Sequence, residues 1–363
     1  MKILTILGTR PEIIRLSLII RKLDQYCDHV LVNTGQNFAT SLNEIFFSEL
    51  NVRKPDYCLG VRGETFGEQI GKLLIEVEKV LIAERPNRVL VLGDTNSGLA
   101  AIVAKRMGIP VFHMEAGNRC YDDRVPEEVN RRIIDHSSSI LMPYTQRSAE
   151  NLVQEGIERR RIYVTGNPIY EVLEANKRAI AESDVLQRLG LTAKSYFAVT
   201  MHRAENVDIE DRLRKLLEGL RLICQEHSWP AVCSLHPRTR NKLQQFGFGA
   251  LDDVGIRFVE PLGFADFVSL EQNASCVLTD SGTVQEECCI FGVPNITIRD
   301  VTERPETIEA GANMLTGIDP KLISASVRTV LGEPSHWKPP AEYTDTNVSS
   351  KIVKIALGYD WLE

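Results

Sequence analysis

The sequence lacks the features that direct a protein to a membrane or to nucleic acid. None of its apolar runs approaches the length of a membrane span, and its first residues lead into a strand-like segment without a signal-peptide pattern. The formal net charge is -7, from 42 basic and 49 acidic residues, which argues against a general nucleic-acid or anionic-membrane surface. We therefore expect a cytoplasmic protein that binds neither nucleic acid nor membranes.

The usual motifs for metals and dinucleotides are also missing. The eight cysteines form no zinc-like C-x-x-C pair, and no D-x-D or His-x-x-x-His spacing supports a metal. Residues 8–12 (GTRPE) contain one glycine, so they do not form the Gly-x-Gly-x-x-Gly fingerprint of dinucleotide-binding proteins. We expect no cofactor, and we interpret the cysteines, including the adjacent Cys288 and Cys289, as small buried thiols in a reduced compartment.

Two successive series of alternating strands and helices account for most of the chain. A chain of 363 residues is too long for one ordinary core and suits two domains. The alternation predicts an α/β protein with two Rossmann-like domains, each a parallel sheet with helices on both faces. The predicted domains are residues 1–168 and 169–347, with a cleft between them and a last helix, within residues 348–363, that packs back on the first. The predicted strands are residues 3–7, 29–33, 88–92, 110–114 and 140–142, then 196–201, 231–235, 256–259, 276–278 and 295–298.

Carboxylates follow two of the strands predicted in the first series. Asp94 comes shortly after one strand, Glu115 ends the next, and Glu127 follows a proline in the first turn of a predicted helix. Since ligands of open α/β sheets bind at the carboxyl ends of the strands, we expect these three acids to converge on one face. They could act as general acid and base or hold a divalent metal. The structural alternatives are helix capping by Asp94 and stabilisation of the helix dipole by the neighbouring Glu128.

Groups suited to anions follow other predicted strands. Arg10 lies at the end of the first strand and faces a helix N-terminus, where a phosphate or carboxylate would bind. A surface arginine is the alternative. In the second series, His202 and His236 each follow a strand and could reach an anionic ligand, although a lone histidine is usually structural.

Residues 279–287 (TDSGTVQEE) form the sharpest motif of the second series. A strand, a turn at Ser281 and Gly282, and a helix present backbone N–H groups and a hydroxyl that suit a pyrophosphate. Glu287 lies in the helix, where it could reach a ribose, whereas helix capping is the alternative role for Asp280 and Ser281. The charged loop 302–306 (TERPE), which contains Arg304, follows the next strand on the same rim.

With these motifs in this order, the chain resembles the non-hydrolysing UDP-N-acetylglucosamine 2-epimerases over nearly its whole length. The resemblance implies the GT-B arrangement of two Rossmann-like domains with the active site in the interdomain cleft. It also implies a UDP-sugar substrate, chemistry without nicotinamide or metal, and a homodimer. It implies catalytic roles for Asp94, Glu115, Glu127 and His202, although His202 could instead contact the phosphates. It also implies UDP-binding roles for Arg10, His236, Phe267, Ser281, Gly282, Glu287 and Arg304.

Within that family, residues 117–120 (GNRC), 124–128 (RVPEE) and 236–240 (HPRTR) are most similar to one branch. That branch makes UDP-N-acetyl-L-fucosamine by 2-epimerisation of a 6-deoxy-talose precursor, for capsule or O-antigen. The chain differs from the glucosamine/mannosamine branch at Arg15, Thr283 and Arg238, where that branch has Lys, Gly and Asn. In bacterial members of that branch, a histidine at the position of Asn37 helps to bind an activating UDP-N-acetylglucosamine.

The resemblance implies epimerisation by elimination and re-addition. Expulsion of UDP from C1 with loss of the C2 proton gives a 2-acetamidoglycal, and UDP then re-adds while a proton returns to the opposite face of C2. The alternatives are a UDP-GlcNAc/UDP-ManNAc 2-epimerase, a GT-B glycosyltransferase, a hydrolysing epimerase and a non-catalytic nucleotide-sugar sensor. Three acids at the strand ends argue against a transferase, for which one general base normally suffices, and against a sensor.

Overall fold

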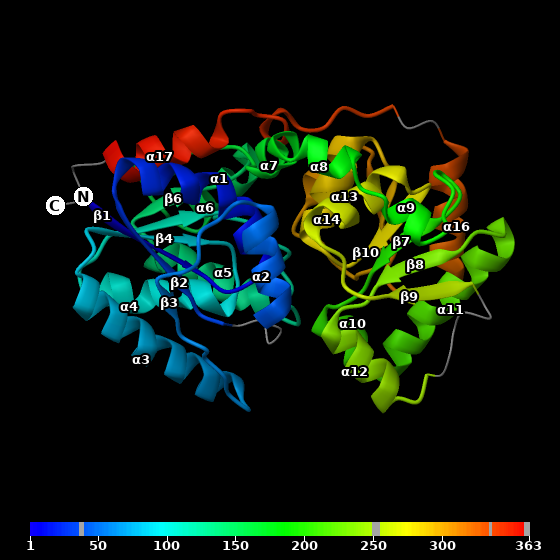
Figure 1. Ribbon diagram of the computed structural model, residues 1–363, viewed down its shortest axis with the longest axis horizontal. Coiled ribbons are helices and arrows are strands. Elements are labelled where there is room, and N and C mark those ends of the chain that lie inside the picture. Colours follow the sequence, from blue (N-terminus) through cyan, green and yellow to red (C-terminus); the bar gives the residue numbers. More distant parts are fainter. Residues whose placement is uncertain (36–39, 249–254, 334–335, 359–363) are drawn as a thin grey trace. The chain divides into compact units, whose positions relative to one another are not determined.

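The chain divides into two compact units in the computed structural model, which describes residues 1–35, 40–248, 255–333 and 336–358 (Figure 1). Unit 1 comprises Met1–Ala175 and Ala341–Glu363, and unit 2 comprises Asn176–Pro340. The sequence places the boundary after residue 168, but helix α7 (Ile169–Ala175) packs against α1 (Arg10–Tyr26) and therefore lies in unit 1. Helix α17 (Val348–Gly358) also packs against α1, so the end of the chain returns to unit 1.

Unit 1 contains a parallel six-stranded sheet with the strand order β3-β2-β1-β4-β5-β6. Its strands are β1 (Lys2–Leu7), β2 (Asp28–Asn33), β3 (Tyr57–Cys58), β4 (Arg88–Leu92), β5 (Val111–Met114) and β6 (Ile140–Met142). Besides α1, α7 and α17, its helices are α2 (Thr40–Glu49), α3 (Phe66–Glu84), η1 (Asn96–Ala100), α4 (Ala101–Arg106), α5 (Pro126–Ser137), α6 (Gln146–Gln154), η2 (Arg159–Arg161) and η4 (Ala341–Tyr343).

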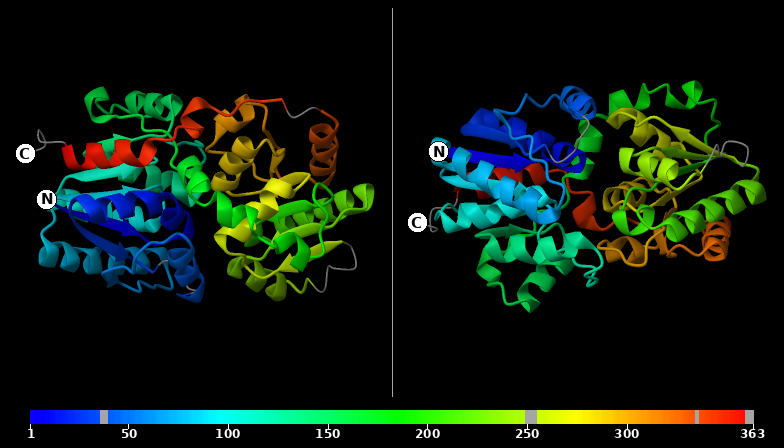
Figure 2. Two further views of the ribbon diagram at one scale, coloured as in Figure 1. Left: turned by 45° about the horizontal axis from the view of Figure 1, so that its top comes forward. Right: turned by 90° about the horizontal axis from the view of Figure 1, so that it is seen from below.

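Helices cover both faces of the unit 1 sheet because alternate residues of each buried strand point to opposite sides. Leu4, Ile6, Val89 and Val91 belong to one apolar cluster that α3, α4 and α5 complete. Helices α1 and α17 lie across the other face (Figure 2). This is the layered arrangement that the strand–helix alternation predicts.

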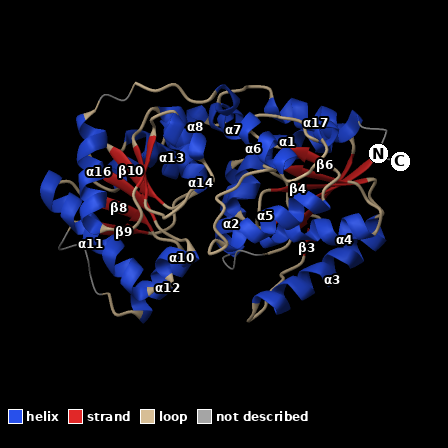
Figure 3. Cartoon of the chain, turned by 180° about the vertical axis from the view of Figure 1, so that it is seen from behind, coloured by secondary structure: helices blue, strands red, loops and turns tan. Residues whose placement is uncertain are grey.

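Unit 2 repeats the same topology, with a parallel sheet of order β12-β11-β10-β7-β8-β9 (Figure 3). Its strands are β7 (Phe197–Thr200), β8 (Ala231–Ser234), β9 (Ile256–Val259), β10 (Cys276–Thr279), β11 (Asn295–Thr297) and β12 (Asn313–Leu315). Its helices are α8 (Lys177–Ala181), α9 (Val185–Arg188), α10 (Ala204–Val207), α11 (Glu210–His227), α12 (Pro237–Gln245), α13 (Phe264–Asn273), α14 (Gly282–Phe291), α15 (Pro305–Glu309) and α16 (Pro320–Gly332). The predicted α/β class with two Rossmann-like sheets is confirmed.

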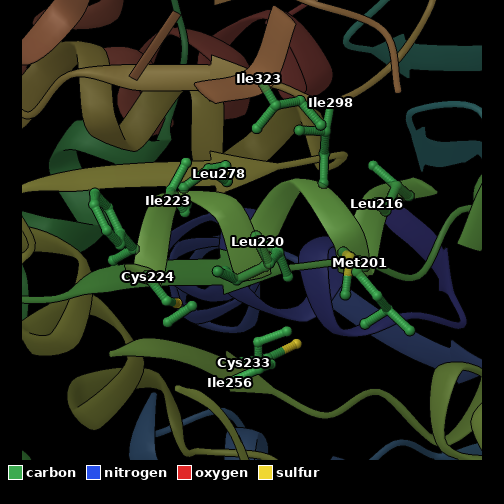
Figure 4. Close-up of a cluster of buried hydrophobic side chains, with 14 of the residues drawn as sticks. Met201, Leu216, Leu220, Ile223, Cys224, Cys233, Ile256, Leu278, Ile298 and Ile323 are labelled. Atoms are coloured by element: carbon green, nitrogen blue, oxygen red, sulfur yellow. The ribbon is translucent and has the colours of Figure 1, made fainter. Parts of the chain in front are cut away.

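The core of unit 2 lies on both sides of this sheet. On one side, Leu220 and Ile223 of α11 and Ile323 of α16 pack against strand residues such as Leu278 (Figure 4). On the other side, α13 and α14 cover strand residues such as Val277. The strand ends next to these helices carry the loops that hold most of the predicted site residues of this unit.

Some details differ from the sequence-based expectation. Strands β3 and β12, two and three residues long, were not predicted. After β4, the chain forms the 3-10 helix η1 before the α-helix α4 begins. Five cysteines are buried as predicted, but Cys58 is exposed and Cys27 and Cys120 are half-buried. Residues 36–39, which include Asn37, lie outside the described residues. Among the residues that the structure describes, no helix has the length and apolar content needed to cross a membrane.

Candidate functional site

The predicted site residues follow the strands at which the order of each sheet reverses. In unit 1, β1 lies between β2 and β4, so the chain builds outward from β1 in one direction and from β4 in the other. In unit 2, β7 and β10 are related in the same way. Such a topological switch point is where open α/β sheets bind ligands, beyond the carboxyl ends of the strands. Arg10 and Asp94 follow the two switch-point strands of unit 1, and His202 and Ser281 follow those of unit 2.

Glu115 occupies an unusual backbone conformation at the carboxyl end of β5. Its φ is +63°, in the left-handed region that non-glycine residues rarely adopt and that is enriched at functional sites. Its carboxylate is almost fully buried and pairs with the guanidinium of Arg15. A methyl group added at Gly93 would lie 3.7 Å from Oε2 of Glu115, so this carboxylate lies beside the turn that carries Asp94. The structure therefore places the Glu115 carboxylate against the residue that precedes Asp94.

Arg131 of α5 connects the Asp94 loop to the start of its own helix. Its guanidinium lies 2.7 Å from Oδ2 of Asp94 and 2.7 Å from Oε2 of Glu128. Glu127 lies next to Glu128 in the first turn of α5 and is half-buried. Asp94 is therefore an ion-paired residue, and it does not cap η1, whose cap position is Thr95.

Glu128 is more than a residue that complements the helix dipole, which corrects the simpler expectation. It is fully buried and accepts hydrogen bonds from the backbone N–H groups of Cys120 (3.0 Å) and Tyr121 (3.1 Å). Its pKa is lowered: burial opposes the ionised form, but the N–H of Cys120 and the guanidinium of Arg131 outweigh burial. Glu128 thus holds the loop between β5 and α5.

The loop after β1 combines Arg10 with a buried acid. Arg10 lies 5.7 Å from the ring of Phe46, burial lowers its pKa, and it forms no ion pair with any described residue. Glu12 accepts hydrogen bonds from Gly8 N (3.0 Å) and Thr9 N (2.7 Å), as in a capping box. It also accepts one from Thr95 Oγ1 (3.1 Å), which connects the loops after β1 and β4. Glu12 was not among the predicted site residues, although the T-x-x-E spacing of residues 9–12 is a visible signal of a capping box.

In unit 2, Asp280 fixes the loop that carries His202. Its carboxylate is fully buried and accepts hydrogen bonds from the N–H groups of His202 (2.9 Å) and Arg203 (2.9 Å). It also lies 3.2 Å from Nδ1 of the His202 ring. The rings of His202 and His236 are 5.4 Å apart, so the structure brings the two predicted histidines together. Capping of α14 by Asp280 is wrong, because Asp280 instead joins β10 to the loop after β7.

The N-terminus of α14 is the expected phosphate-binding element. Ser281 occupies its N-cap position, but its side chain accepts no hydrogen bond from a helix N–H group, so the capping alternative is wrong here too. A Cβ at Gly282 would lie 2.8 Å from Oε1 of Glu303, so a larger residue at this turn would displace the Glu303 side chain. Arg304 is buried and pairs with Glu286 of α14, which fixes the 302–306 loop against this helix.

The remaining predicted residues lie on the two helices beside this turn. Glu287 is on α14 and is 3% exposed, and Phe267 is on α13, half-buried against the apolar cluster beneath both helices. No group of three or more His, Cys, Asp or Glu side chains is arranged for a metal within the described parts of the chain. Charged groups at the switch points of two Rossmann-type sheets define the protein as an α/β protein of the class that binds ligands beyond the strand ends.

Comparisons with known proteins give the family. Residues 21–357 match the family model described as UDP-N-acetylglucosamine 2-epimerase. The chain is 44% identical over 363 residues to the UDP-N-acetylglucosamine 2-epimerase of Methanocaldococcus jannaschii, covering 98% of each chain. It is 40% identical over 337 residues to the UDP-2,3-diacetamido-2,3-dideoxy-D-glucuronate 2-epimerase of Pseudomonas aeruginosa, covering 92% of this chain and 93% of that one.

Solved structures agree with this assignment. The fold matches the crystal structure of the M. jannaschii enzyme in complex with UDP-GlcNAc and UDP, with a TM-score of 0.93, 43% identity and coverage of 98% of this chain and 99% of that one. It also matches the enzyme from Neisseria meningitidis bound to UDP-GlcNAc, with a TM-score of 0.90, 28% identity and coverage of 99% and 100%. The chain belongs to the UDP-N-acetylglucosamine 2-epimerase family, whose members are isomerases, and the predicted family is confirmed.

Proposed function

We propose that the protein is a non-hydrolysing 2-epimerase of a UDP-N-acetylhexosamine. The observation that carries the proposal is the environment of Glu115, a buried carboxylate held in left-handed backbone beside the Gly93–Asp94 turn. Strained backbone at a strand end is a feature of catalytic groups. The two relatives compared above are both named as 2-epimerases of UDP-linked sugars, which supports the reaction more strongly than it supports any one sugar.

The proposed reaction breaks and re-forms two bonds. Loss of the C2 proton to a carboxylate and departure of UDP from C1 leave a C1=C2 double bond, that of the 2-acetamidoglycal. UDP then re-forms its bond to C1 while a second group returns a proton to the opposite face of C2. Two acid–base groups are needed, and Asp94, Glu115 and Glu127 are the candidates. Arg15 and Arg131 hold two of them in place through ion pairs.

Unit 2 supplies the groups suited to the departing diphosphate. Negative charge develops on UDP as its bond to C1 breaks, so donors aimed at that charge accelerate the step. His202, anchored by Asp280, and the N-terminus of α14 at Gly282 offer such donors, and Arg10 of unit 1 adds positive charge. The proposal requires the acids of unit 1 and these groups of unit 2 to act on one substrate.

For the sugar, we propose UDP-N-acetyl-L-fucosamine as the product, made from its 6-deoxy-talose epimer for capsule or O-antigen. Sequence similarity in residues 117–120, 124–128 and 236–240 is the support. Among these residues, Arg119 pairs with buried Asp135, and Arg238 pairs with Asp208. UDP-GlcNAc/UDP-ManNAc epimerisation is the second candidate, favoured by the name of the M. jannaschii relative.

The experiment that tests the reaction uses deuterated water without added NAD. Each of a panel of UDP-N-acetylhexosamines and their 6-deoxy forms is incubated with the protein, and the products are analysed by NMR. We expect a 2-epimer carrying deuterium at C2 and UDP that stays attached to sugar at equilibrium. A product that retains the original C2 proton would exclude the elimination route. Accumulation of free sugar would indicate a hydrolysing epimerase, and turnover only with an added acceptor would indicate a glycosyltransferase.

A further inference from the structure

Helices α13 and α14 of unit 2 bring two buried glutamates together. The side chains of Glu271 on α13 and Glu287 on α14 are within hydrogen-bonding reach of each other, and Glu271 is 0% exposed. Neither oxygen of Glu271 accepts a hydrogen bond from a hydroxyl, amide or cationic group of the described residues. The polar partner of this buried carboxyl group is therefore a second carboxyl group.

The groups that might otherwise solvate Glu271 are used elsewhere. The hydroxyl of Tyr196 donates to the carbonyl oxygen of Leu270 at 2.5 Å. The ammonium of Lys194 donates to the carbonyl oxygens of Gln272 (2.9 Å) and Ala274 (2.8 Å) at the end of α13. The rest of the surroundings is the apolar cluster of Leu270, Val284 and Cys288.

In such surroundings, ionisation of both carboxylates would strongly raise the free energy of the folded protein. Like charges at hydrogen-bonding distance repel strongly where water is excluded, and a buried carboxylate without donors loses its hydration. A single proton removes both problems, because a carboxylic acid donates to a carboxylate through a short, charge-assisted hydrogen bond. Burial first, and the neighbouring Glu287 second, raise the pKa of Glu271 well above its ordinary value.

We propose that Glu271 is a positioning residue for nucleotide binding: it keeps its proton, donates it in a hydrogen bond to Glu287, and thereby holds that carboxylate ready to accept the ribose hydroxyls of UDP. This inference rests on the proposed function, in which Glu287 contacts the ribose. Glu271 itself touches no ligand in this proposal. Its effect should therefore appear in affinity for the ribose and not in the chemical step.

The hydrogen bond also makes nucleotide affinity depend on pH. When the shared proton is lost, two buried negative charges repel and Glu287 leaves its position, so UDP should bind more weakly as pH rises. Among the described residues, Tyr196 before β7 and Cys288 of α14 interact electrostatically with the pair. Cys276 of β10 and Lys194 interact with Cys288. Arg188 of α9 pairs with Asp184 and with Asp266 of α13, and Arg178 of α8 pairs with Glu182.

Two variants separate positioning from packing. In E271Q the side chain keeps its shape and an N–H donor that cannot titrate, and in E271L the donor is removed. The matched control is L270A, which disturbs the packing of the same helix and leaves the glutamate pair intact. Each protein is titrated by calorimetry with UDP and with 2′-deoxy-UDP between pH 7 and pH 10, and its thermal unfolding and kcat are measured in parallel.

We expect E271L to bind UDP roughly ten- to a hundred-fold more weakly than wild type, as for loss of a hydrogen bond to a charged group. The loss of affinity in E271L should be smaller for 2′-deoxy-UDP than for UDP, because one ribose hydroxyl is already absent from that ligand. At pH 7, E271Q should bind UDP with the affinity of the wild type. As pH rises, UDP affinity should fall in the wild type but not in E271Q. Ionisation of the ligand itself appears in all the profiles and therefore cancels in the comparison. L270A should unfold at a lower temperature with the wild-type pH profile.

Equal losses for both ligands in E271L, or a pH profile of E271Q that follows wild type, would overturn the inference. If E271L does not fold, the pH dependence of UDP affinity in E271Q still tests the inference. Failure of the proposed function looks different, because wild-type protein would then bind no UDP or would not turn over any UDP-N-acetylhexosamine. A wild type that epimerises its substrate while E271L binds both ligands normally would reject the role of Glu271 alone.

Discussion

The imidazole of His113 and the carboxylate of Asp135 connect the two loops that carry proposed catalytic acids. Nδ1 of His113 lies 2.9 Å from Oδ1 of Asp135, and Nε2 lies 2.8 Å from the carbonyl oxygen of Gly93. The second oxygen of Asp135 accepts the backbone N–H of Gly117 at 3.2 Å. Gly93 directly precedes the first acid, and Gly117 lies two residues after the second. This buried network therefore fixes the spacing of the two loops.

We expect Asp135→Asn to reduce both stability and turnover. The carboxylate also pairs with the fully buried guanidinium of Arg119 at 2.7 Å, and removing one partner of a buried pair costs about 3–5 kcal/mol. The measurement is urea unfolding together with kcat. The control is Asp123→Asn, an exposed carboxylate paired with Arg132 at 3.0 Å, whose change should stay within about 0.5 kcal/mol. A wild-type unfolding curve for Asp135→Asn would show that the network does not hold the loops.

Adjacent glutamates at the start of α5 should behave differently. Glu127→Gln removes a proposed proton-transfer group, so we expect a loss of turnover on the order of a hundred- to ten-thousand-fold with little change in UDP affinity. Glu128→Gln should instead lower the free energy of unfolding, because Glu128 accepts two backbone N–H groups and pairs with Arg131. Glu115→Gln should follow the pattern of Glu127→Gln. Near-normal turnover in Glu127→Gln would reduce that residue to a structural role.

The stability of the protein should depend on Glu12 between about pH 4.5 and pH 7. Burial raises the pKa of Glu12 from 4.5 to about 7, although the hydrogen bonds that it accepts oppose this shift. The native state therefore binds more protons than the unfolded state in that window, and the contribution of Glu12 to stability falls as pH rises. The side chain in Glu12→Gln cannot titrate. Its unfolding free energy should therefore fall less steeply with rising pH across this window than that of the wild type. Identical slopes for both proteins across the window would refute the assignment.

Arg10→Ala should weaken the binding of UDP itself. Arg10 forms no ion pair within the described parts of the chain, so its charge is available to an anion at the end of β1. Calorimetry with UDP at two salt concentrations measures the effect, and the loss should be larger at low salt. Arg21→Ala, on the exposed side of the same helix, is the matched control. Unaltered UDP affinity in Arg10→Ala would place Arg10 outside the site.

Much of this fold was predictable because buried parallel strands are short continuous apolar runs. Residues 88–92, 140–142 and 256–259 match β4, β6 and β9 at both ends. The positions of Asp94, Glu115, His202 and Ser281 at strand ends followed from the same runs. Strands β3 and β12 were missed because pairing with a neighbouring strand, and not their own pattern, makes them strands.

The partners of the site residues were harder to predict. Arg15 and Glu115 are 100 residues apart, and Asp280 meets His202 across 78 residues, so local patterns carry no information about either pair. The same holds for Glu271, which looks like an ordinary polar residue of an amphipathic helix and is fully buried. Glu128 was underestimated because two of its donors, the backbone N–H groups of Cys120 and Tyr121, lie in an irregular loop whose path has no simple sequence pattern.

Finally, the protein should need no UDP-N-acetylglucosamine as an activator. An effector shifts an equilibrium only through contacts that differ between two states. Two residues implied by the family resemblance for the activator site are changed here, with Asn37 in place of His and Arg238 in place of Asn. The N–H of Arg238 donates to Nδ1 of His236 at 3.2 Å, and its guanidinium lies 2.6 Å from Asp208, so a cation paired within unit 2 stands where the other branch has a neutral amide.

The reverse reaction tests this prediction when it is started from the 2-epimerised product alone, with and without a trace of UDP-N-acetylglucosamine. We expect linear progress curves with no lag in both cases, because no effector has to accumulate before the enzyme turns over. The double variant Asn37→His/Arg238→Asn is the matched control, since it restores both altered side chains and should gain a response to the effector if those contacts carry it. A long lag in the wild type that the trace abolishes would show that the activator site survives, and would favour the glucosamine substrate over the 6-deoxy sugar.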